Sequence, residues 1–525
     1  MVFAAGAALY ASSLAFKLLN WDDQVYITGN PWIQGLTWEH LKQIFTRPYF
    51  LNYLPLHLLS YALDYQIWGM KAIGFHAGSV LWNAVNGVLA VMVVRRLTGS
   101  LTIAFIAGLL FAAHPSHVET VAWVSIRKDL VSTTFLLLSV DAYLRARDGP
   151  TLHRTPYMFS ILFFALGLLS KMSIVAMPVF LVLVDLIRPG GSQNQKRPSW
   201  GKIAVSKLPY VAVAAPLLLV NWQVQVKSGL PEAQGAWSYA VVKGHAAWNY
   251  IGLLLGVRSD IPVYDLPKGA LGPARTLVEL AGLVVLPVLI WAAYRLRRPL
   301  ECLGLGWVFV MLLPAIAFPL LTYMADRYLY APSLGFCLVI ASLIVAVSRA
   351  VHHTGMRRLL TAALAAVPLV AFTYRTEQYL PVWRDSESLW TEALTKCRDY
   401  RAYNNLGAVR LEQRRWNEAE HLYRLGTQTE QPNELSYRSL GVLYYTLGRY
   451  GEALGASDTA LVLLRKTGWD PVEASQLEFE RGAIFDARGD RSAAIQSWEA
   501  ALRLNAANAN ARYWLDQARS KTAPK

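Results

Sequence analysis

The chain has 525 residues, of which 54% are hydrophobic and only 16% are charged. A soluble protein has roughly a quarter of its residues charged, so this composition excludes an ordinary soluble domain and indicates a polytopic membrane protein. The formal net charge of +15 does not require a nucleic-acid partner, because membrane proteins concentrate Lys and Arg in their cytoplasmic loops. The three cysteines are widely separated and form no CxxC pair, which predicts neither a disulfide framework nor a metal site.

Apolar segments fill the chain to about residue 375 and then stop. This shift predicts an all-α fold with a multi-span membrane domain over 1–375 and a polar domain over 376–525. We expect about eleven spans, although several are shorter than the ~20 residues that a crossing needs. The predicted spans lie at roughly 2–19, 73–94, 101–113, 130–144, 157–170, 174–187, 208–222, 275–294, 303–318, 333–348 and 359–374.

The first span has no clear cleavage site before Trp21, so we expect a retained helix. The apolar segment 238–256 is interpreted as re-entrant or interfacial, because a crossing there would place the arginines of 295–298 outside. A chain that starts so close to its first span is typical of bacterial proteins, so the expected location is a bacterial inner membrane.

Basic residues fall on alternate loops, and these loops should be cytoplasmic. They are Arg95-Arg96, Arg145 with Arg147, Arg188 with Lys196 to Lys207, Arg295 to Arg298, and Arg357-Arg358. The opposite face then carries 22–23, 114–129, Lys171, the 223–272 region, 326–327 and everything after Arg375. The polar domain is therefore predicted to be periplasmic or luminal.

The polar domain contains an internal repeat. Leu406-Gly407 and Leu440-Gly441 are 34 residues apart, and Ala419 and Ala453 keep this interval, which is the tetratricopeptide spacing. Arg481-Gly482, with Ala494 and Trp498, forms a third and looser copy. Stretch 383–397 resembles half of a preceding repeat, and a capping helix is expected near 507–520. The repeat pattern predicts that these helices form an α-solenoid, but it does not identify the ligand that the solenoid binds.

Two adjacent carboxylates, Asp22 and Asp23, directly follow the first span. Carboxylates are costly in lipid and are usually kept near it by a function or by a partner. They could be a simple helix-stop and cap feature at the membrane interface. The alternative is that they lie at the mouth of a cavity and act on a lipid-borne substrate.

Three further motifs lie on the same predicted face. The first is His114-Pro-Ser-His117-Val-Glu119, followed by Arg127-Lys128-Asp129. Two His and one Glu could ligate a metal, but the Pro-interrupted start lacks HExxH geometry, so polar contacts to substrate or structure are favoured.

The other two motifs are Ser170-Lys171 and Asp326-Arg327. Lys171 could be a snorkelling turn lysine, and Asp326-Arg327 could be a structural salt bridge. Alternatively, both cations contact a phosphate, which the guanidinium fork fits well.

A carboxylate pair and several cations on one face suit sugar transfer from a polyprenyl phosphate. The leaving phosphate needs cations that stabilise its developing charge, and the acceptor hydroxyl needs a general base. We therefore predict that Asp22 or Asp23 is the base and that Arg127, Lys128, Lys171 and Arg327 hold the phosphate. The chain has no P-loop and no Rossmann glycine fingerprint, and we expect no metal and no cofactor.

In these motifs the sequence resembles the transmembrane and tetratricopeptide-repeat O-mannosyltransferases of the C-type glycosyltransferase superfamily. The resemblance follows nearly the whole chain in order. It rests on Asp22-Asp23 with Asn30-Pro31, Tyr53-Leu54-Pro55-Leu56, Phe75-His76, His114 to Asp129, Ser170-Lys171, Asp326 to Ser333, Trp383 and the repeats. Asp326 stands where Glu is common in the family, and about three repeats are fewer than members often carry.

The resemblance implies an extracytoplasmic active site, a donor such as polyprenyl-phosphate mannose, and a protein or peptide acceptor that the repeats help to present. It also implies further pocket residues, which we expect to be His57, His114, His117, Glu119, Asp129, Asp326 and Tyr330. One rival hypothesis is a membrane-anchored repeat scaffold that recruits periplasmic partners. Another is a flippase or polymerase of lipid-linked oligosaccharides, but its charges would lie inside the spans.

Overall fold

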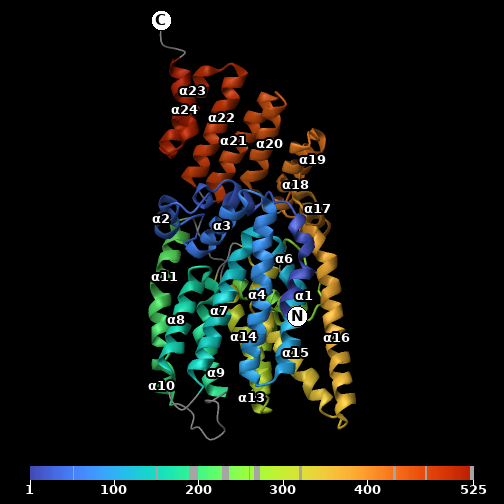
Figure 1. Ribbon diagram of the computed structural model, residues 1–525. Helices are drawn as coiled ribbons and strands as arrows, with labels where there is room; N and C mark the ends of the chain where they lie inside the picture. Colours follow the sequence, from blue (N-terminus) through green and yellow to red (C-terminus); the bar gives the residue numbers. More distant parts are fainter. Residues whose placement is uncertain are drawn as a thin grey trace. The chain divides into compact units, whose positions relative to one another are not determined.

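The computed structural model describes residues 1–525 except 51, 149–151, 188–198, 228–235, 259, 265–271, 319–321, 430–432, 468–469 and 521–525. In the described part of the chain every regular element is a helix, apart from one isolated bridge between Tyr49 and Asn52. The chain divides into two compact units, Met1–Asp385 and Ser386–Lys525 (Figure 1). The boundary expected after residue 375 falls inside a helix of the first unit.

The first unit is a bundle of long helices that run roughly alongside one another (Figure 1). Its helices are α1 (Val2–Leu9), α2 (Trp38–Thr46), α3 (Pro55–Trp68), α4 (Ala72–Thr98), α5 (Leu101–Ala113), α6 (Val118–Ala122), α7 (Arg127–Ala146), α8 (Arg154–Leu168), α9 (Met177–Ile187), α10 (Trp200–Val205), α11 (Leu208–Lys227), α12 (Ala236–Leu254), α13 (Pro273–Arg295), α14 (Pro299–Ala317), α15 (Ser333–Ser348) and α16 (Thr354–Tyr379). Short 3₁₀ turns at Val124–Ile126 and Asp326–Leu329 lie between α6 and α7 and between α14 and α15.

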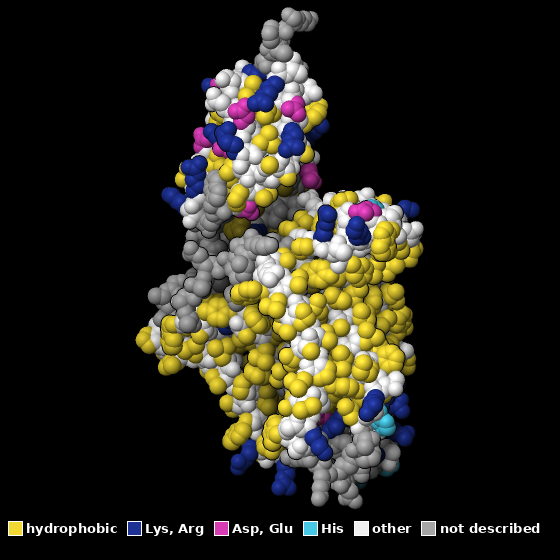
Figure 2. Space-filling model, turned by 90° about the vertical axis from the view of Figure 1, so that its left-hand side faces the viewer, with side chains coloured by type: hydrophobic (Ala, Val, Ile, Leu, Met, Phe, Trp, Pro, Cys, Tyr) yellow, Lys and Arg dark blue, Asp and Glu magenta, His cyan; other side chains and the backbone are white. Residues whose placement is uncertain are grey.

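Within the described ranges of the chain, four helices are long and apolar enough to cross a membrane, namely α4, α13, α14 and α16 with its continuation to Trp383. A fifth span results if α5 is joined to Pro115–Ala122, although the two are bent by 53° where Pro115 interrupts the helix. The chain is therefore a multi-pass membrane protein, and one side of the bundle is broadly hydrophobic (Figure 2). Other predicted spans form shorter apolar helices, such as α8 and α15, so the predicted count of eleven crossings is not confirmed among the described residues.

The N-terminal segment is not the single helix over 2–19 that the apolar pattern predicts. α1 ends at Leu9, and a 3₁₀ turn over Ala11–Ala15 follows. The Ser13 hydroxyl donates to the Tyr10 carbonyl oxygen at 2.7 Å, and local hydrogen bonds of this kind compete with continuation of an α-helix. The prediction of one uninterrupted helix is wrong because it counted apolar residues and ignored the serines.

The second unit consists of short helices packed in sequence order. They are α17 (Ser386–Lys396), α18 (Tyr400–Glu412), α19 (Trp416–Thr427), α20 (Glu434–Thr446), α21 (Tyr450–Thr467), α22 (Pro471–Arg488), α23 (Arg491–Leu504) and α24 (Ala509–Ser520). The helices pair as α18–α19, α20–α21 and α22–α23, as the three copies of the repeat predict. Ala419, Ala453 and Ala494 are fully buried, because paired helices must approach closely at these positions.

Candidate active site

A cavity of about 290 Å³ lies within the Met1–Asp385 unit. Its lining includes Asp22, Lys128, Lys171 and Arg327. These residues come from the loop after the N-terminal segment, the first turn of α7, the turn between α8 and α9, and the 3₁₀ turn before α15. The structure therefore brings together four of the predicted site residues, which are separated by up to about 300 residues in the sequence.

Asp22 contributes the carboxylate of the cavity. Among the described residues it has no hydrogen-bond or ion-pair partner within the protein, so both of its oxygens are available to a ligand. Burial raises the pKa of Asp22, and the positive charges of Lys128 and Arg327 partly oppose this rise. A carboxyl group with a raised pKa can accept and release a proton closer to neutral pH than an exposed aspartate can.

Asp23 does not line this cavity, and its carboxylate points into the protein. One oxygen accepts a hydrogen bond from the Leu19 amide at 2.8 Å, and the other accepts from the Ser125 amide at 3.0 Å and from the Ser125 hydroxyl. Its side chain is buried, and this burial raises the pKa of Asp23 to about 6 despite the three donors. The two adjacent aspartates therefore have different environments, which sequence alone could not separate.

The three cations of the cavity are held in different ways. Lys171 Nζ donates to Asp129 Oδ1 at 2.5 Å, and Arg327 pairs with Glu119 through both its guanidinium and its backbone amide, the latter at 2.9 Å from Glu119 Oε2. Lys128 lies 5.3 Å from the centroid of the Tyr26 ring and has no ion-pair partner among the described residues. Two cations are thus fixed by carboxylates, and the third is unpaired.

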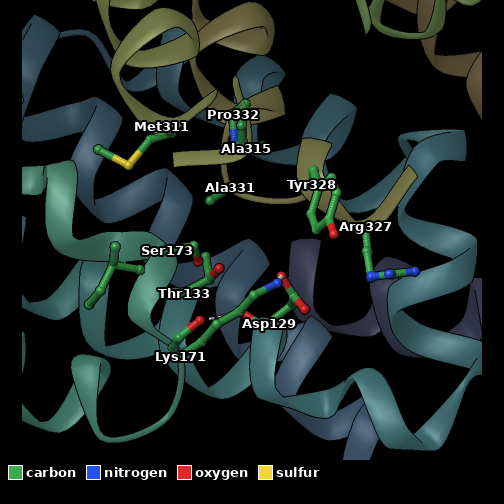
Figure 3. A pocket seen from close by; sticks show the side chains of 12 residues that line it. Asp129, Thr133, Lys171, Ser173, Met311, Ala315, Arg327, Tyr328, Ala331 and Pro332 are labelled. Atoms are coloured by element: carbon green, nitrogen blue, oxygen red, sulfur yellow. Dashed lines mark hydrogen bonds and ion pairs between the residues drawn. The ribbon is translucent and has the colours of Figure 1, made fainter. Parts of the chain in front are cut away.

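A second, smaller cavity of about 30 Å³ shares Lys171, Arg327 and Tyr328 with the first. Figure 3 shows the Lys171 side chain extending toward Asp129, with Arg327 and Tyr328 on the opposite side of the small cavity. Lys171 Nζ lies 5.4 Å and the Arg327 guanidinium 5.1 Å from the centroid of the Tyr328 ring. Tyr328, which was not among the predicted site residues, therefore contacts both fixed cations.

Arg127, which was predicted to hold a phosphate, is absent from the lining of both cavities. Its guanidinium is fully buried, pairs with Asp64, and donates to the backbone oxygens of Phe75 and Ser60. All of these partners lie on α3 or α4. Arg127 therefore joins the start of α7 to two neighbouring helices and is not available to a ligand.

Five of the remaining predicted pocket residues contact other groups of the protein. His57 contacts the Tyr61 hydroxyl at 2.7 Å, and His114 and His117 contact the Leu254 carbonyl oxygen and the Ser333 hydroxyl at 3.3 and 2.8 Å. The Tyr264 hydroxyl donates to Asp326 at 2.5 Å, and the Tyr330 hydroxyl donates to Asn83 at 2.9 Å. None of these five predicted residues lines the cavity.

Metal ligation is not supported for the His114–Glu119 motif. Its two His and its Glu each contact a different partner. Over the described ranges of the chain, no group of three His, Cys, Asp or Glu side chains could hold a metal ion. The motif instead positions Arg327 through Glu119.

Most of the remaining cavity wall is apolar. It consists of Leu54, Ile126, Met172, Val175, Leu218, Trp222, Pro314, Ala315 and Phe318, with the polar residues Asn52, Ser173 and Asn221. The Asn221 amide oxygen accepts a hydrogen bond from the Tyr53 backbone amide at 3.0 Å and so connects α11 to the loop before α3. Asn221 could have been found as a polar residue near the end of the apolar segment 208–222. Cations beside an apolar wall suit an amphiphile with an anionic head and a hydrocarbon tail.

The fold and this cavity define a helical, multi-pass membrane protein with a charged, partly apolar pocket. Residues 54–220 match the family described as dolichyl-phosphate-mannose-protein mannosyltransferase. The chain is 25% identical over 441 residues to human protein O-mannosyl-transferase TMTC4, covering 72% of this chain and 59% of that protein. It is 24% identical over 414 residues to protein O-mannosyl-transferase F38B6.6 of Caenorhabditis elegans, covering 74% of this chain and 56% of that protein.

These matches confirm the resemblance to the O-mannosyltransferases with transmembrane and repeat domains, and the chain spans about half the length of the curated relatives that it matches. Among solved structures, ArnT from Cupriavidus metallidurans in the apo state is similar with a TM-score of 0.42 and 13% identity, over 73% of this chain and 77% of that chain. A TM-score of this size does not establish a shared fold.

Proposed function

We propose that the protein is a membrane glycosyltransferase that moves a sugar, mannose or a similar hexose, from a polyprenyl-phosphate donor to a hydroxyl acceptor. The observation that carries the proposal is the unpaired Asp22 carboxylate in the same cavity as Lys128, Lys171 and Arg327. The match of residues 54–220 to the mannosyltransferase family supports the same reaction class.

In the proposed complex the donor phosphate lies among the three cations. Lys128 forms no ion pair with a carboxylate of the described residues, and the guanidinium of Arg327 can bind phosphate oxygens in a bidentate manner. The prenyl chain then follows the apolar wall near Leu218, Trp222 and Phe318. In a site of low dielectric, fixed cations stabilise the charge that develops on a departing phosphate strongly.

Asp22 is proposed to be the general base. It removes the proton from the acceptor hydroxyl as the oxygen attacks C1 of the sugar, and the bond from C1 to the phosphate oxygen breaks. The polyprenyl phosphate leaves with the electron pair, and attack opposite to this leaving group inverts the anomeric centre. Asp23 is a positioning residue that fixes the loop carrying Asp22 through Ser125. The reaction consumes one donor and one hydroxyl and requires no metal.

The acceptor is proposed to be a protein Ser or Thr hydroxyl on the extracytoplasmic side of a bacterial or luminal membrane. The superhelical surface of stacked helix pairs suits extended peptides, so the Ser386–Lys525 unit is the proposed acceptor-presenting domain. The competing hypothesis of a membrane-anchored scaffold gives no reason for an unpaired carboxylate and an unpaired lysine in one cavity, since both are costly there.

The proposal is tested with membranes that contain the full chain and undecaprenyl-phosphate mannose labelled in the sugar. We expect the label to pass into the protein fraction, and Asp22→Asn to lower the transfer rate by at least about 100-fold, the usual contribution of a general base. Binding of unlabelled undecaprenyl phosphate should survive Asp22→Asn, whereas Lys128→Gln should weaken it about tenfold.

Asp148→Asn is the matched control, because Asp148 is an exposed aspartate paired with Arg96 and does not line the cavity. It should transfer sugar at the wild-type rate. Wild-type transfer by Asp22→Asn would overturn the proposed mechanism. If Asp22→Asn is silent and removal of residues 386–525 alone abolishes the cellular phenotype, the scaffold hypothesis is correct.

A further inference from the structure

A large groove lies at the other end of the first unit from the candidate active site. It has a volume of about 910 Å³ and runs between α5, the end of α15 and the first half of α16. α5 begins in this groove and ends at the motif that positions Arg327, whereas α15 begins near Arg327 and ends in the groove. In Figure 1 the junction between α15 and α16 lies at the same end of the bundle as α10.

One end of the groove is strongly basic. Arg349, Arg357 and Arg358 line it, and among the lining residues that the structure describes there is no Asp or Glu. The three side chains are exposed and have no ion-pair partner within the described chain. Three unpaired guanidinium groups around one groove repel one another, so an anion between them would be stabilising.

The rest of the groove is apolar and lies on the surface of a membrane-spanning unit. Phe105, Ile106 and Leu109 form one wall, and Ala362, Ala365 and Ala366 leave space along α16. Only 11% of the apolar window of the span Thr354–Trp383 is buried within the protein, so this helix is largely available to lipid. A hydrocarbon chain along α5 and α16 would therefore lead directly to the arginines.

We propose that this groove is a binding site for an anionic glycerophospholipid of the adjacent leaflet, with its phosphate among Arg349, Arg357 and Arg358 and an acyl chain between α5 and α16. Basic pockets between membrane helices recognise anionic headgroups in this manner, and guanidinium groups bind phosphate oxygens bidentately. The lipid ties α16 to the rest of the bundle. The proposal does not depend on glycosyl transfer, because the groove and the candidate active site share no residue.

The test uses the full-length protein purified in a non-ionic detergent and analysed by native mass spectrometry with added phosphatidylglycerol, phosphatidylcholine or undecaprenyl phosphate. We expect phosphatidylglycerol to bind more tightly than phosphatidylcholine. The double substitution Arg357→Gln with Arg358→Gln should weaken phosphatidylglycerol binding on the order of tenfold. The matched control is Arg95→Gln with Arg297→Gln, which removes the same charge from helix ends outside the groove and should leave binding unchanged.

A second variant tests the apolar part of the groove without any change of charge. Ala362→Leu with Ala366→Leu places two larger side chains in the groove at exposed positions, so the fold should tolerate them while phosphatidylglycerol binding weakens. The proposal is overturned if wild type binds the two phospholipids equally, or if both double variants bind phosphatidylglycerol like wild type. Loss of undecaprenyl phosphate binding in the Arg357–Arg358 variant, with phosphatidylglycerol binding unaffected, would identify the polyprenyl carrier as the occupant and overturn it as well.

Discussion

Asp23 Oδ1 accepts hydrogen bonds from both the backbone amide of Ser125, at 3.0 Å, and the Ser125 hydroxyl. Ser125 lies in the 3₁₀ turn that leads into α7, and Lys128 is in the first turn of that helix. The two bonds therefore fasten the loop that carries Asp22 to the segment that carries Lys128. This link explains why two adjacent carboxylates have different roles in the proposed reaction, since one faces the cavity and the other holds the first in place.

The first prediction concerns this division of roles. Asp23→Ala should lower the free energy of unfolding at pH 7 by about 2 kcal/mol, because it leaves three buried donors without an acceptor. Thermal unfolding of the full chain in detergent, followed by tryptophan fluorescence, measures the change. Asp22→Ala is the control at the neighbouring position. It should stay within about 0.5 kcal/mol of wild type, because Asp22 makes no hydrogen bond to another described residue that would be lost. Equal destabilisation by both variants would contradict the interpretation that Asp23, and not Asp22, holds the loop in place.

The second prediction is a pH dependence of stability that opposes the usual one for aspartate. Burial raises the pKa of Asp23 from 3.8 to about 6, so between these values the folded state binds more protons than the unfolded state. The part of the Asp23 contribution to stability that depends on its protonation is then fully present below pH 3.8 and is lost as the pH rises through about 6, with a total change of about 3 kcal/mol.

The measurement compares wild type with Asp23→Ala at pH 4 and pH 7. Asp23→Ala should lower the free energy of unfolding more at pH 4 than at pH 7, because the wild-type protein is stabilised at pH 4 and the variant lacks the titrating group. Asp22→Ala again serves as the control for loss of a neighbouring carboxylate. If Asp23→Ala lowers the free energy of unfolding more at pH 7, the pKa of Asp23 is lowered in the folded protein, which would contradict the prediction.

Much of the fold follows from apolar patterns that the sequence displays directly. The segment 333–348 predicted as a span coincides with α15, and the 34-residue interval of Gly407 and Gly441 correctly predicts the helix pairs of the second unit. Both predictions are correct because burial of an apolar face determines where a helix begins and ends. The break after Leu9 was missed because it depends on one local hydrogen bond from Ser13.

The site was less predictable, because sequence shows which residues are charged but not which charges pair. Arg127 and Lys128 are adjacent, yet Arg127 faces Asp64 of α3 whereas Lys128 faces the cavity. Successive residues of a helix point about 100° apart. The packing of α7 against α3 and α4 therefore decides which of the two cations has an ion-pair partner inside the protein. The same holds for Tyr328, whose contact with Lys171 depends on the position of α8.

The third prediction concerns the pair formed by Glu119 and Arg327. Glu119 is 1% and Arg327 12% exposed, and replacing one member of a buried pair leaves the other charge uncompensated. Glu119→Gln should therefore lower the free energy of unfolding by about 2–4 kcal/mol. Undecaprenyl phosphate should then raise the unfolding temperature more in this variant than in wild type, because the phosphate replaces the lost carboxylate as the partner of Arg327.

Asp148→Asn provides the control for loss of an ion pair, since its pair with Arg96 is largely exposed and should contribute only about 0–1 kcal/mol. Undecaprenyl phosphate should stabilise this control and wild type equally. A smaller stabilisation of Glu119→Gln than of wild type would show that Arg327 needs Glu119 to reach the phosphate, and it would contradict the prediction.

The last prediction tests the close packing of the repeats. A Cβ atom added at Gly407 would lie 2.4 Å from a ring carbon of Tyr423, and this ring is buried between α18 and α19. Gly407→Ala should therefore destabilise the Ser386–Lys525 unit by about 1–3 kcal/mol through overpacking. Hydrogen exchange of the full chain should become faster in α18 and α19.

Gly451→Ala is the matched control, because a Cβ atom there meets no other atom within 4 Å and alanine favours the helix by about 0.5–1 kcal/mol. Exchange in α21 should then be unchanged or slower, and faster exchange in both variants would mean that the effect does not come from the Tyr423 contact.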